Sequence, residues 1–494
     1  MDVYGNYIAG RWGEAASGQV LEDRNPATGE LLGYVTRSGP DEVDAAVNAA
    51  REAFHRWRLY PAPRRAEILF RAAQLLAERK ERLARLMTQE MGKVLMEARG
   101  DVQEGIDMTF FMAGEGRRLA GQTVPAEHPN KWAMSVREPV GVVAAITPWN
   151  FPLAIPTWKL MPALVAGNTV VFKPSSETSM LAYELVRILE EAGLPPGVVN
   201  LVMGTGAEVG EALLTHPGVD LISFTGSLEM GKRVQALAAP LMKRIHLELG
   251  GKNAITVLAD ADLDLAVQGI VWSAFGTTGQ RCTACSRVLV ERPVRDELLE
   301  RLIPKVEALT LGDGLDPSTD VGPLINRAAV EKVARYVDIG LQEGARLVTG
   351  GRPATEGALA RGHFFQPTVF VDVRPDSRLA QEEIFGPVLS IITVEDLDEA
   401  IEVNNRIPYG LSSAIYTRDV NKAFRAMRDL SSGICYINAG TIGAEVQLPF
   451  GGFRGTGNGH REAGIAALDV YTEWKAIYVD FSGKLQRAQI DPVT

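Results

Sequence analysis

The sequence predicts an α/β protein with parallel sheets, and three observations support this fold class. Apolar strands alternate with helices from Val140 onward, which is typical of parallel strands joined by crossover helices. The alternation stops near residue 250 and restarts near Ala254. With 494 residues, 46% of them hydrophobic, the chain exceeds a single core and can fill two or three domains.

The first forty residues indicate short strands and turns, with a turn at 25–29. A helix then begins at Pro40, because proline suits the first turn and the acids that follow suit the positive end of the helix dipole. Its apolar residues recur on one face, and the same spacing predicts helices through 68–87 and 102–111.

Two alternating series follow, with no internal repeat or low-complexity linker between them. The first has expected strands at 140–146, 169–172, 198–202 and 221–225, and helices at 181–191 and from about 228. The second has expected strands from 254 and at 288–290, 345–348, 369–371 and 389–394. Segments 121–137 and 471–494 alternate like strands but have no obvious core of their own.

Composition excludes several partners and compartments. The net charge of -10 and the pI near 5.4 argue against a general surface for nucleic acid or anionic membranes, which accumulated Lys and Arg would hold. Three cysteines, at 282, 285 and 435, are too few for a disulfide framework and favour a reducing compartment, so we expect the cytoplasm. We expect neither a signal peptide nor a membrane span.

Two motifs provide a thiol and a carboxylate for two-stage acyl chemistry. The segment Phe275-Gly-Thr-Thr-Gly-Gln-Arg-Cys282 places a cysteine after a glycine-containing turn. Its thiolate can form a covalent acyl-enzyme, which is a thioester. In Glu248-Leu-Gly-Gly251, the carboxylate is the candidate base that activates water against this thioester, a role favoured if burial raises its pKa.

Further motifs supply an oxyanion donor and a place for a cofactor. Asn150, in Trp149-Asn-Phe-Pro152, offers its side-chain amide to a developing oxyanion, together with the backbone N–H of Cys282. Phe224-Thr-Gly-Ser227 places a strand end before a helix N-terminus, which attracts a pyrophosphate. Gly204-Thr-Gly206 precedes another helix, although an ordinary strand–helix turn is the commoner meaning of such a pattern.

In their order along the chain, these motifs resemble the aldehyde dehydrogenase superfamily, from about Tyr7 to Tyr478. The resemblance implies a Rossmann-like cofactor domain at 1–120 and 138–250, and an α/β catalytic domain at 251–450. It also implies a β-rich oligomerisation arm at 121–137 and 471–494. A homodimer or homotetramer is expected, because an exposed sheet edge normally needs covering. A small aldehyde is the expected substrate, with no metal, nucleic acid or membrane as partner.

The resemblance also implies the roles of individual residues. The catalytic residues would be Cys282, Glu248, Asn150, Lys159 and Glu473, of which the last two assist proton movement around the base. The cofactor-binding residues would be Ile146, Trp149, Lys173, Ser176, Gly206, Phe224, Gly226, Ser227, Gly250, Glu383 and Phe385. Lys173 would hold the adenine-ribose hydroxyls, Glu383 and Phe385 would fix the nicotinamide ribose and ring, and Gly250 would let the backbone approach the ring. The substrate residues would be Phe151, Trp158, Arg281 and Phe450.

One departure from the family pattern bears on the cofactor. Strictly NAD-using relatives often carry Glu three residues after the lysine, where it repels a 2′-phosphate, whereas this chain has Ser176 there and Glu177 beside it. The cofactor is therefore expected to be NADP or NAD, with NADP accepted. Segments 110–118, 278–282 and 443–450 look most like bacterial α-ketoglutaric semialdehyde (2,5-dioxovalerate) dehydrogenases. Glyceraldehyde, succinic semialdehyde and a broad aldehyde range are the alternatives.

Several alternatives stay open at the level of sequence. Arg281 either binds the distal carboxylate of a semialdehyde acid or forms a structural ion pair. Cys285 is interpreted as a neighbour of Cys282, with a reversible disulfide between them as the alternative, because no histidine cluster completes a metal site. Two other classes of protein remain as rivals: an inactive structural relative, and a cofactor-free cysteine hydrolase with a histidine base.

Overall fold

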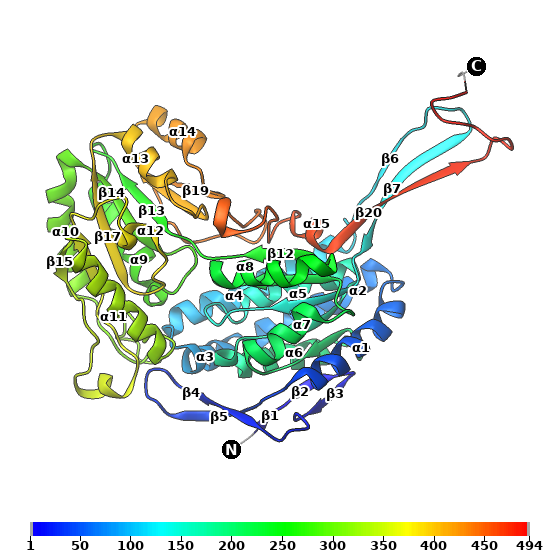
Figure 1. Ribbon diagram of the computed structural model, residues 1–494, viewed down its shortest axis with the longest axis horizontal. Helices are drawn as coiled ribbons and strands as arrows, with labels where there is room; N and C mark the ends of the chain where they lie inside the picture. The colour runs from blue at the N-terminus through cyan, green and yellow to red at the C-terminus, as the bar shows by residue number, and fades with distance from the viewer. Residues whose placement is uncertain (1–2, 492–494) are drawn as a thin grey trace.

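The computed structural model describes residues 3–491 and consists of two lobes with a projecting arm (Figure 1). Each lobe contains a seven-stranded sheet. The order in the first is β12-β11-β8-β9-β10-β2-β3, and in the second β15-β16-β17-β14-β13-β18-β19. A small sheet, β1-β5-β4, lies near the N-terminus, and a three-stranded sheet, β20-β7-β6, forms the arm.

The first sheet has five parallel strands, extended by an antiparallel pair from the N-terminus. Its strands are β2 (Asn6–Ile8), β3 (Arg11–Gly13), β8 (Val142–Ile146), β9 (Thr169–Lys173), β10 (Val199–Leu201), β11 (Leu221–Thr225) and β12 (Arg244–Glu248). Alternate strand residues face opposite sides. Val143 and Phe172 join a core with α4 and α5, whereas Val142 and Phe224 pack with α1 and α8 on the other face.

The helices of this lobe are α1 (Pro40–Trp57), α2 (Ala62–Glu78), α3 (Lys80–Met91), α4 (Leu95–Glu115), α5 (Ala154–Ala166), α6 (Ser179–Glu191), α7 (Glu211–Thr215) and α8 (Leu228–Ala238). The single helix predicted through 68–87 is wrong, because Arg79 leaves helical geometry (φ -102°, ψ 7°) and separates α2 from α3. The strand predicted from Val140 begins at Val142. Gly141 turns the chain with φ 142°, where a Cβ atom would lie 2.1 Å from Asp220 Oδ2.

The second sheet is parallel except for its edge strand β15. Its strands are β13 (Asn253–Val257), β14 (Cys285–Glu291), β15 (Arg346–Thr349), β16 (Thr368–Val371), β17 (Val388–Val394), β18 (Ser412–Tyr416) and β19 (Ile434–Ile437). Its helices are α9 (Leu263–Phe275), α10 (Arg295–Glu307), α11 (Arg327–Gln342), α12 (Arg378–Gln381), α13 (Leu397–Asn405) and α14 (Val420–Asp429). The chain passes between the two sheets at 249–252, where the alternation was expected to restart.

The arm consists of β6 (Gln122–Pro125), β7 (Lys131–Pro139) and β20 (Thr472–Asp480), and it extends away from both lobes (Figure 1). The small N-terminal sheet contains β1 (Val3–Tyr4), β4 (Val20–Arg24) and β5 (Leu31–Thr36). Segment 451–470, which none of the predicted domains includes, returns to the first lobe: Gly457 bridges to Glu248, and α15 (Ala467–Tyr471) packs on α5. The expected arm residues 492–494 lie outside the described chain.

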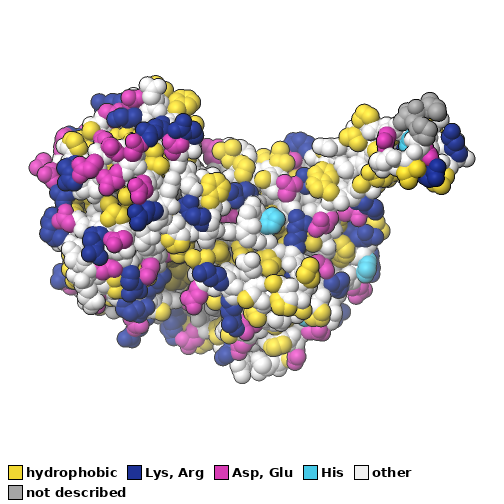
Figure 2. Space-filling model, turned by 45° about the horizontal axis from the view of Figure 1, so that its top comes forward, with side chains coloured by type: hydrophobic (Ala, Val, Ile, Leu, Met, Phe, Trp, Pro, Cys, Tyr) yellow, Lys and Arg dark blue, Asp and Glu magenta, His cyan; other side chains and the backbone are white. Residues whose placement is uncertain are grey.

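Acidic and basic side chains are intermixed on the face drawn in Figure 2, with no basic field. Within residues 3–491, none of the helices combines the length and the apolar character that a membrane crossing requires. The domain boundaries expected from sequence stay predictions.

Candidate active site

Cys282 follows α9 on a turn that is held in a strained conformation. Thr277 and Thr278 have φ angles of 52° and 58°, which are left-handed and unfavourable for β-branched residues. The Glu97 carboxylate on α4 accepts hydrogen bonds from the Thr277 backbone N–H at 2.9 Å and from its hydroxyl at 3.1 Å. Thr278 donates to the carbonyl of Gly322 at 2.9 Å. These contacts fix the turn, and strain maintained in this way is typical of functional sites.

A cavity of about 200 Å³ brings many of the predicted site residues together. It is lined by Pro148, Trp149, Asn150, Ile155, Thr225, Gly226, Ser227, Leu249, Gly250, Cys282, Lys332, Glu383 and Phe385. Trp149 and Phe385 meet edge to face, with ring centroids 5.6 Å apart. The cavity thus joins the end of β11, the crossing segment between the sheets and the cysteine turn.

The Cys282 thiol is held in its neutral form. Burial, followed by the charges of Glu383 and Glu248, raises the pKa of the thiol to about 12, while the backbone N–H of Thr283 partly offsets this by donating to the sulfur. The Asn150 side-chain amide donates to the carbonyl of Gln280 at 3.1 Å, two residues before the thiol. Asn150 and Cys282 line the same cavity.

Glu248 ends β12 and is buried with neither carboxylate oxygen hydrogen-bonded within the described chain. Burial raises its pKa well above the ordinary value, and the nearby Glu462 raises it further. Lys159, on α5, is fully buried and forms an ion pair with Glu462. A carboxyl group in this environment is suited to general-base chemistry near neutral pH.

The structure contradicts the prediction for Glu473. Its side chain lies on β20, is 64% exposed and pairs with Arg244 at 2.5 Å. The carboxylate beside Lys159 and Glu248 is that of Glu462. Glu462 reaches this position because an antiparallel bridge between the backbones of Phe450 and Glu462 returns the chain to the first sheet. Sequence reasoning missed Glu462 and its neighbour His246, since no motif separates them from ordinary charged residues.

The expected adenosine-side residues lie beyond this cavity. Lys173 ends β9 and donates from Nζ to the carbonyl of Pro174 at 2.7 Å, and burial lowers its pKa to about 8. Ser176 begins a short 3-10 turn. The Glu177 carboxylate accepts a hydrogen bond from Asn326 at 3.0 Å and is thereby occupied.

The remaining cofactor candidates surround the same strands. Ile146 ends β8 and Phe224 is the penultimate residue of β11, while Ser227 caps α8 by accepting from the Met230 N–H. Gly206 begins a short helical turn before α7 and does not line the cavity. Lys332, on α11, lines the cavity but belongs to no motif, so sequence reasoning missed it.

The four expected substrate residues form two contact pairs, and none of them lines the cavity around Cys282. Trp158 and Phe450 pack edge to face with ring centroids 4.9 Å apart. Phe151 lies under two cations: the Lys93 ammonium is 3.9 Å from its ring centroid and the Arg281 guanidinium 5.6 Å.

Arg281 itself is held by two contacts. Its Nη2 pairs with Glu97 at 3.1 Å and its Nε donates to the Thr277 hydroxyl at 2.9 Å. Of the two interpretations of Arg281, the structural ion pair is therefore present. Its Nη1 makes no hydrogen bond within residues 3–491, so the second interpretation stays a prediction.

Cys285 begins β14 three residues after Cys282, and its thiol donates to the carbonyl of Arg287 at 3.3 Å. Burial raises its pKa to about 12, and both cysteines are reduced. Over the part of the chain that is described, no group of three metal-ligating side chains occurs. The sequence interpretation of Cys285 as a packed neighbour agrees with this position.

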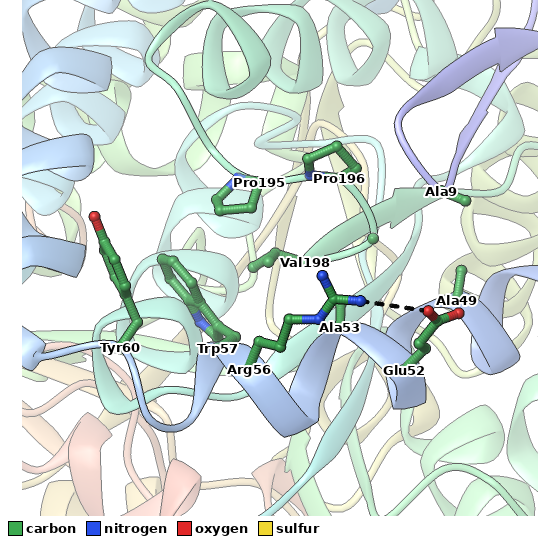
Figure 3. A pocket seen from close by; sticks show the side chains of 11 residues that line it. Ala9, Ala49, Glu52, Ala53, Arg56, Trp57, Tyr60, Pro195, Pro196 and Val198 are labelled. Atoms are coloured by element: carbon green, nitrogen blue, oxygen red, sulfur yellow. Dashed lines mark ion pairs between the residues drawn. The ribbon is translucent and has the colours of Figure 1, made fainter.

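A second cavity of about 400 Å³ lies between α1 and the loop at 195–198 (Figure 3). Trp57 and Tyr60 stack in its wall opposite Pro195 and Pro196, and Arg56 lies close to Glu52. It shares no residue with the cavity around Cys282. The chemistry described above therefore belongs to the first cavity.

Comparison with known proteins gives matches over nearly the whole chain. The profile of the aldehyde dehydrogenase family matches residues 12–477. An alpha-ketoglutaric semialdehyde dehydrogenase of Bacillus subtilis is 39% identical over 97% of this chain and 98% of its own length. An alpha-ketoglutarate semialdehyde dehydrogenase of Haloferax volcanii is 43% identical over 96% and 98%.

Solved structures of similar sequence share the fold. A betaine aldehyde dehydrogenase of Staphylococcus aureus, in complex with NAD+, superimposes with a TM-score of 0.95 at 36% identity, covering 98% of this chain and 96% of that one. An NAD-dependent aldehyde dehydrogenase of Sinorhizobium meliloti gives a TM-score of 0.95 at 38% identity, covering 99% and 96%.

Proposed function

The chain belongs to the aldehyde dehydrogenase family, and we propose that within it the substrate is a semialdehyde acid such as α-ketoglutaric semialdehyde. It is an NAD(P)-dependent enzyme that oxidises an aldehyde. The observation that carries the proposal is the meeting of Cys282 and Asn150 in one cavity, with the unpartnered Glu248 within electrostatic reach of the thiol.

In the proposed reaction, the sulfur of Cys282 adds to the aldehyde carbon and forms a thiohemiacetal. The negative charge that develops on the oxygen is stabilised by the Asn150 amide and the Cys282 backbone N–H, as in other oxyanion holes. Since the thiol has a raised pKa, its proton must pass to a base as the bond forms. Glu383, and then Glu248, are the carboxylates whose charges act on that thiol, so this step has a candidate base other than Glu248.

Loss of a hydride to NAD(P) and of the hydroxyl proton would turn the thiohemiacetal into a thioester, and hydrolysis of this thioester requires a water molecule activated by a base. Glu248 takes this role, because its raised pKa makes its carboxylate a stronger base than an exposed one. The water oxygen then attacks the thioester carbon, the C–S bond breaks, and the carboxylic acid leaves with the thiol restored.

The residues of the cavity fit a nicotinamide dinucleotide. The N-terminus of α8, capped by Ser227, follows the end of β11 and can attract an anionic group. Gly226 and Gly250 have no side chain that would obstruct the approach to this N-terminus. A Cβ atom at Gly250 would lie 2.2 Å from Glu383 Oε2, so a larger residue would fit only if the Glu383 side chain moved. Lys173, Glu383 and Phe385 would hold the ribose and ring portions of the cofactor, whose nicotinamide would supply the hydride acceptor when bound.

We expect NADP to be used, because Ser176 leaves room and a hydroxyl for a 2′-phosphate, while Glu177 is held by Asn326. Ser176→Glu should lower kcat/KM with NADP about tenfold or more, since about 1.4 kcal/mol of lost binding has that effect. NAD use should stay or improve. The measurement is the ratio of the two efficiencies with one good aldehyde.

The matched control for Ser176 is Glu177→Gln, which should leave the cofactor ratio unchanged. If the wild type does not use NADP, or if the ratio of the two efficiencies changes only in the Glu177 variant, another residue determines the cofactor preference.

The substrate proposal is supported by the two relatives named above and by the cation next to the nucleophile. Within residues 3–491, Nη1 of Arg281 makes no hydrogen bond, and a guanidinium can donate hydrogen bonds to a carboxylate. Glu104 on α4 lies within electrostatic reach of Arg281, and burial, followed by the charge of Asp101, raises the pKa of Glu104 to about 8. The raised pKa weakens the repulsion that this carboxyl would exert on an anionic substrate.

We expect Arg281→Leu to raise KM for acidic aldehydes about tenfold or more, and KM for neutral aldehydes much less, because only the former use the guanidinium. Parallel kinetics with a carboxylated and an uncharged aldehyde of equal length provide the test. A similar increase for both aldehydes would assign Arg281 to the Glu97 ion pair alone.

A homodimer or homotetramer is proposed from the surface of the arm. Four large side chains of the arm are each more than half exposed: Trp132, Trp474, Tyr478 and Phe481. An exposed apolar surface of this kind is typical of a contact with another subunit.

An aldehyde panel assayed with both cofactors tests the proposed function as a whole. Selective formation of reduced cofactor with semialdehyde acids supports it. A preference for glyceraldehyde, or a broad range of neutral aldehydes, would replace the substrate. No cofactor reduction with any aldehyde would favour the inactive relative, and cofactor-free hydrolysis would favour the cysteine hydrolase.

A further inference from the structure

His246 lies between two buried carboxylates in the interior of the first lobe. Its Nε2 is 3.7 Å from Glu248 Oε1 and its Nδ1 is 3.7 Å from Glu462 Oε1. The histidine side chain is completely buried, and each carboxylate side chain is 3% exposed. One imidazole thus separates the proposed base from the carboxylate that pairs with Lys159.

The geometry follows from strand register. His246 and Glu248 are two residues apart on β12, so their side chains project from the same face of the sheet. Ser223 is the direct partner of His246 on the adjacent β11, and its hydroxyl lies 3.1 Å from Nδ1. The same hydroxyl contacts Lys159 Nζ at 3.2 Å and the Tyr471 hydroxyl at 3.0 Å.

Glu248 needs an outlet for the proton that it takes from water. Its two oxygens and His246 Nε2 are all buried without a hydrogen-bond partner in the described chain. Unpaired buried polar atoms are costly and call for an explanation. The 3.7 Å separations exceed a hydrogen bond, but a movement of about 1 Å would close each, and catalytic contacts are often long before substrate binds.

We propose that His246 relays the proton from Glu248 to Glu462, an inference that rests on the base role proposed for Glu248. The Glu248 carboxyl gives its proton to Nε2 while Nδ1–H gives its proton to the Glu462 carboxylate. Glu248 becomes the carboxylate again, Glu462 becomes the acid, and the imidazole is neutral before and after. The cycle closes when Glu462 releases this proton to solvent and the imidazole exchanges protons with water to regain the Nδ1–H tautomer.

The surroundings favour this neutral relay over a charged imidazolium. Burial lowers the pKa of His246 well below 6.5, and the positive charges of Lys159, His460 and Arg244 lower it further. Transfer at both nitrogens together avoids placing a positive charge in this interior. His460 is partly exposed, and its ring centroid lies 6.0 Å from that of His246.

The test compares the burst of reduced cofactor with steady-state turnover in His246→Gln, which keeps a polar side chain but has no second nitrogen to pass a proton on. The burst should stay within about threefold of wild type, while kcat falls about tenfold or more. In His246→Ala, added imidazole should restore kcat. His216→Gln is the matched control, since His216 pairs with Asp44 and has no contact with the cluster. It should behave as wild type.

Two outcomes would overturn the relay. One is a steady-state rate of His246→Gln close to wild type. The other is an equal loss of burst and turnover in both His246 variants without rescue by imidazole, which would indicate a structural role. Glu248→Gln, measured alongside, distinguishes failure of the relay from failure of the base role. If Glu248→Gln turns over normally, Glu248 is not the base. If it stalls while His246→Gln does not, only the relay fails.

Discussion

Cys282→Ala is expected to abolish aldehyde oxidation while NAD(P) binding survives. The thiol forms the covalent bond to the aldehyde carbon, whereas the cofactor contacts proposed here come from Lys173, Glu383 and the N-terminus of α8. Without the nucleophile there is no thiohemiacetal, so kcat should fall about a thousandfold or more.

The measurement pairs cofactor reduction with a binding titration of NAD(P) to the same protein. Cys435→Ala is the matched control: Cys435 lies on β19 and does not line the cavity, so this variant should retain activity. Turnover by Cys282→Ala near the wild-type rate would disprove the covalent mechanism. Loss of cofactor binding together with activity would instead indicate damage to the cavity.

The fold class was predictable because hydrophobic periodicity reports local structure directly. The buried strands β8, β9 and β11 are apolar runs bounded by turns, and the family resemblance drawn from separate motifs is confirmed. The strand β12 was not predicted, because Arg244, His246 and Glu248 interrupt its apolar pattern. His246 and Glu248 are residues that the proposed site uses, so the hydrophobic pattern failed to predict a strand where functional residues interrupt it.

The candidate site was predictable where chemistry lies in contiguous motifs. Asn150, Gly250, Cys282 and Phe385 are far apart in sequence but meet in one cavity. Glu462 was not predictable, because its position beside Lys159 depends on a backbone bridge to Phe450 that only the tertiary structure contains. The misplacement of Glu473 has the same cause: strand β20 carries this residue to the exposed base of the arm.

Glu248→Gln should still release a burst of reduced cofactor, of about one per active site, and then stall at the thioester. The amide has nearly the same shape as the carboxyl group but cannot accept a proton from water, so hydride transfer proceeds wherever it does not need the base. Turnover should fall about a hundredfold or more, since general-base catalysis typically contributes that much. Mass spectrometry of the stalled enzyme should find the acyl adduct on Cys282.

The pH dependence of this step provides an independent check, and its sign follows from the environment of Glu248. Burial and Glu462 raise the pKa of Glu248 well above 4.5, and only the ionised form activates water. Wild-type deacylation should therefore be slow at low pH and increase as pH rises through this raised pKa, with a midpoint well above that of an exposed glutamate. This acid limb should disappear in Glu248→Gln, because the amide does not titrate. A stalled enzyme without an adduct on Cys282, or an unchanged acid limb, would assign the base to another group, of which Glu462 is the nearest.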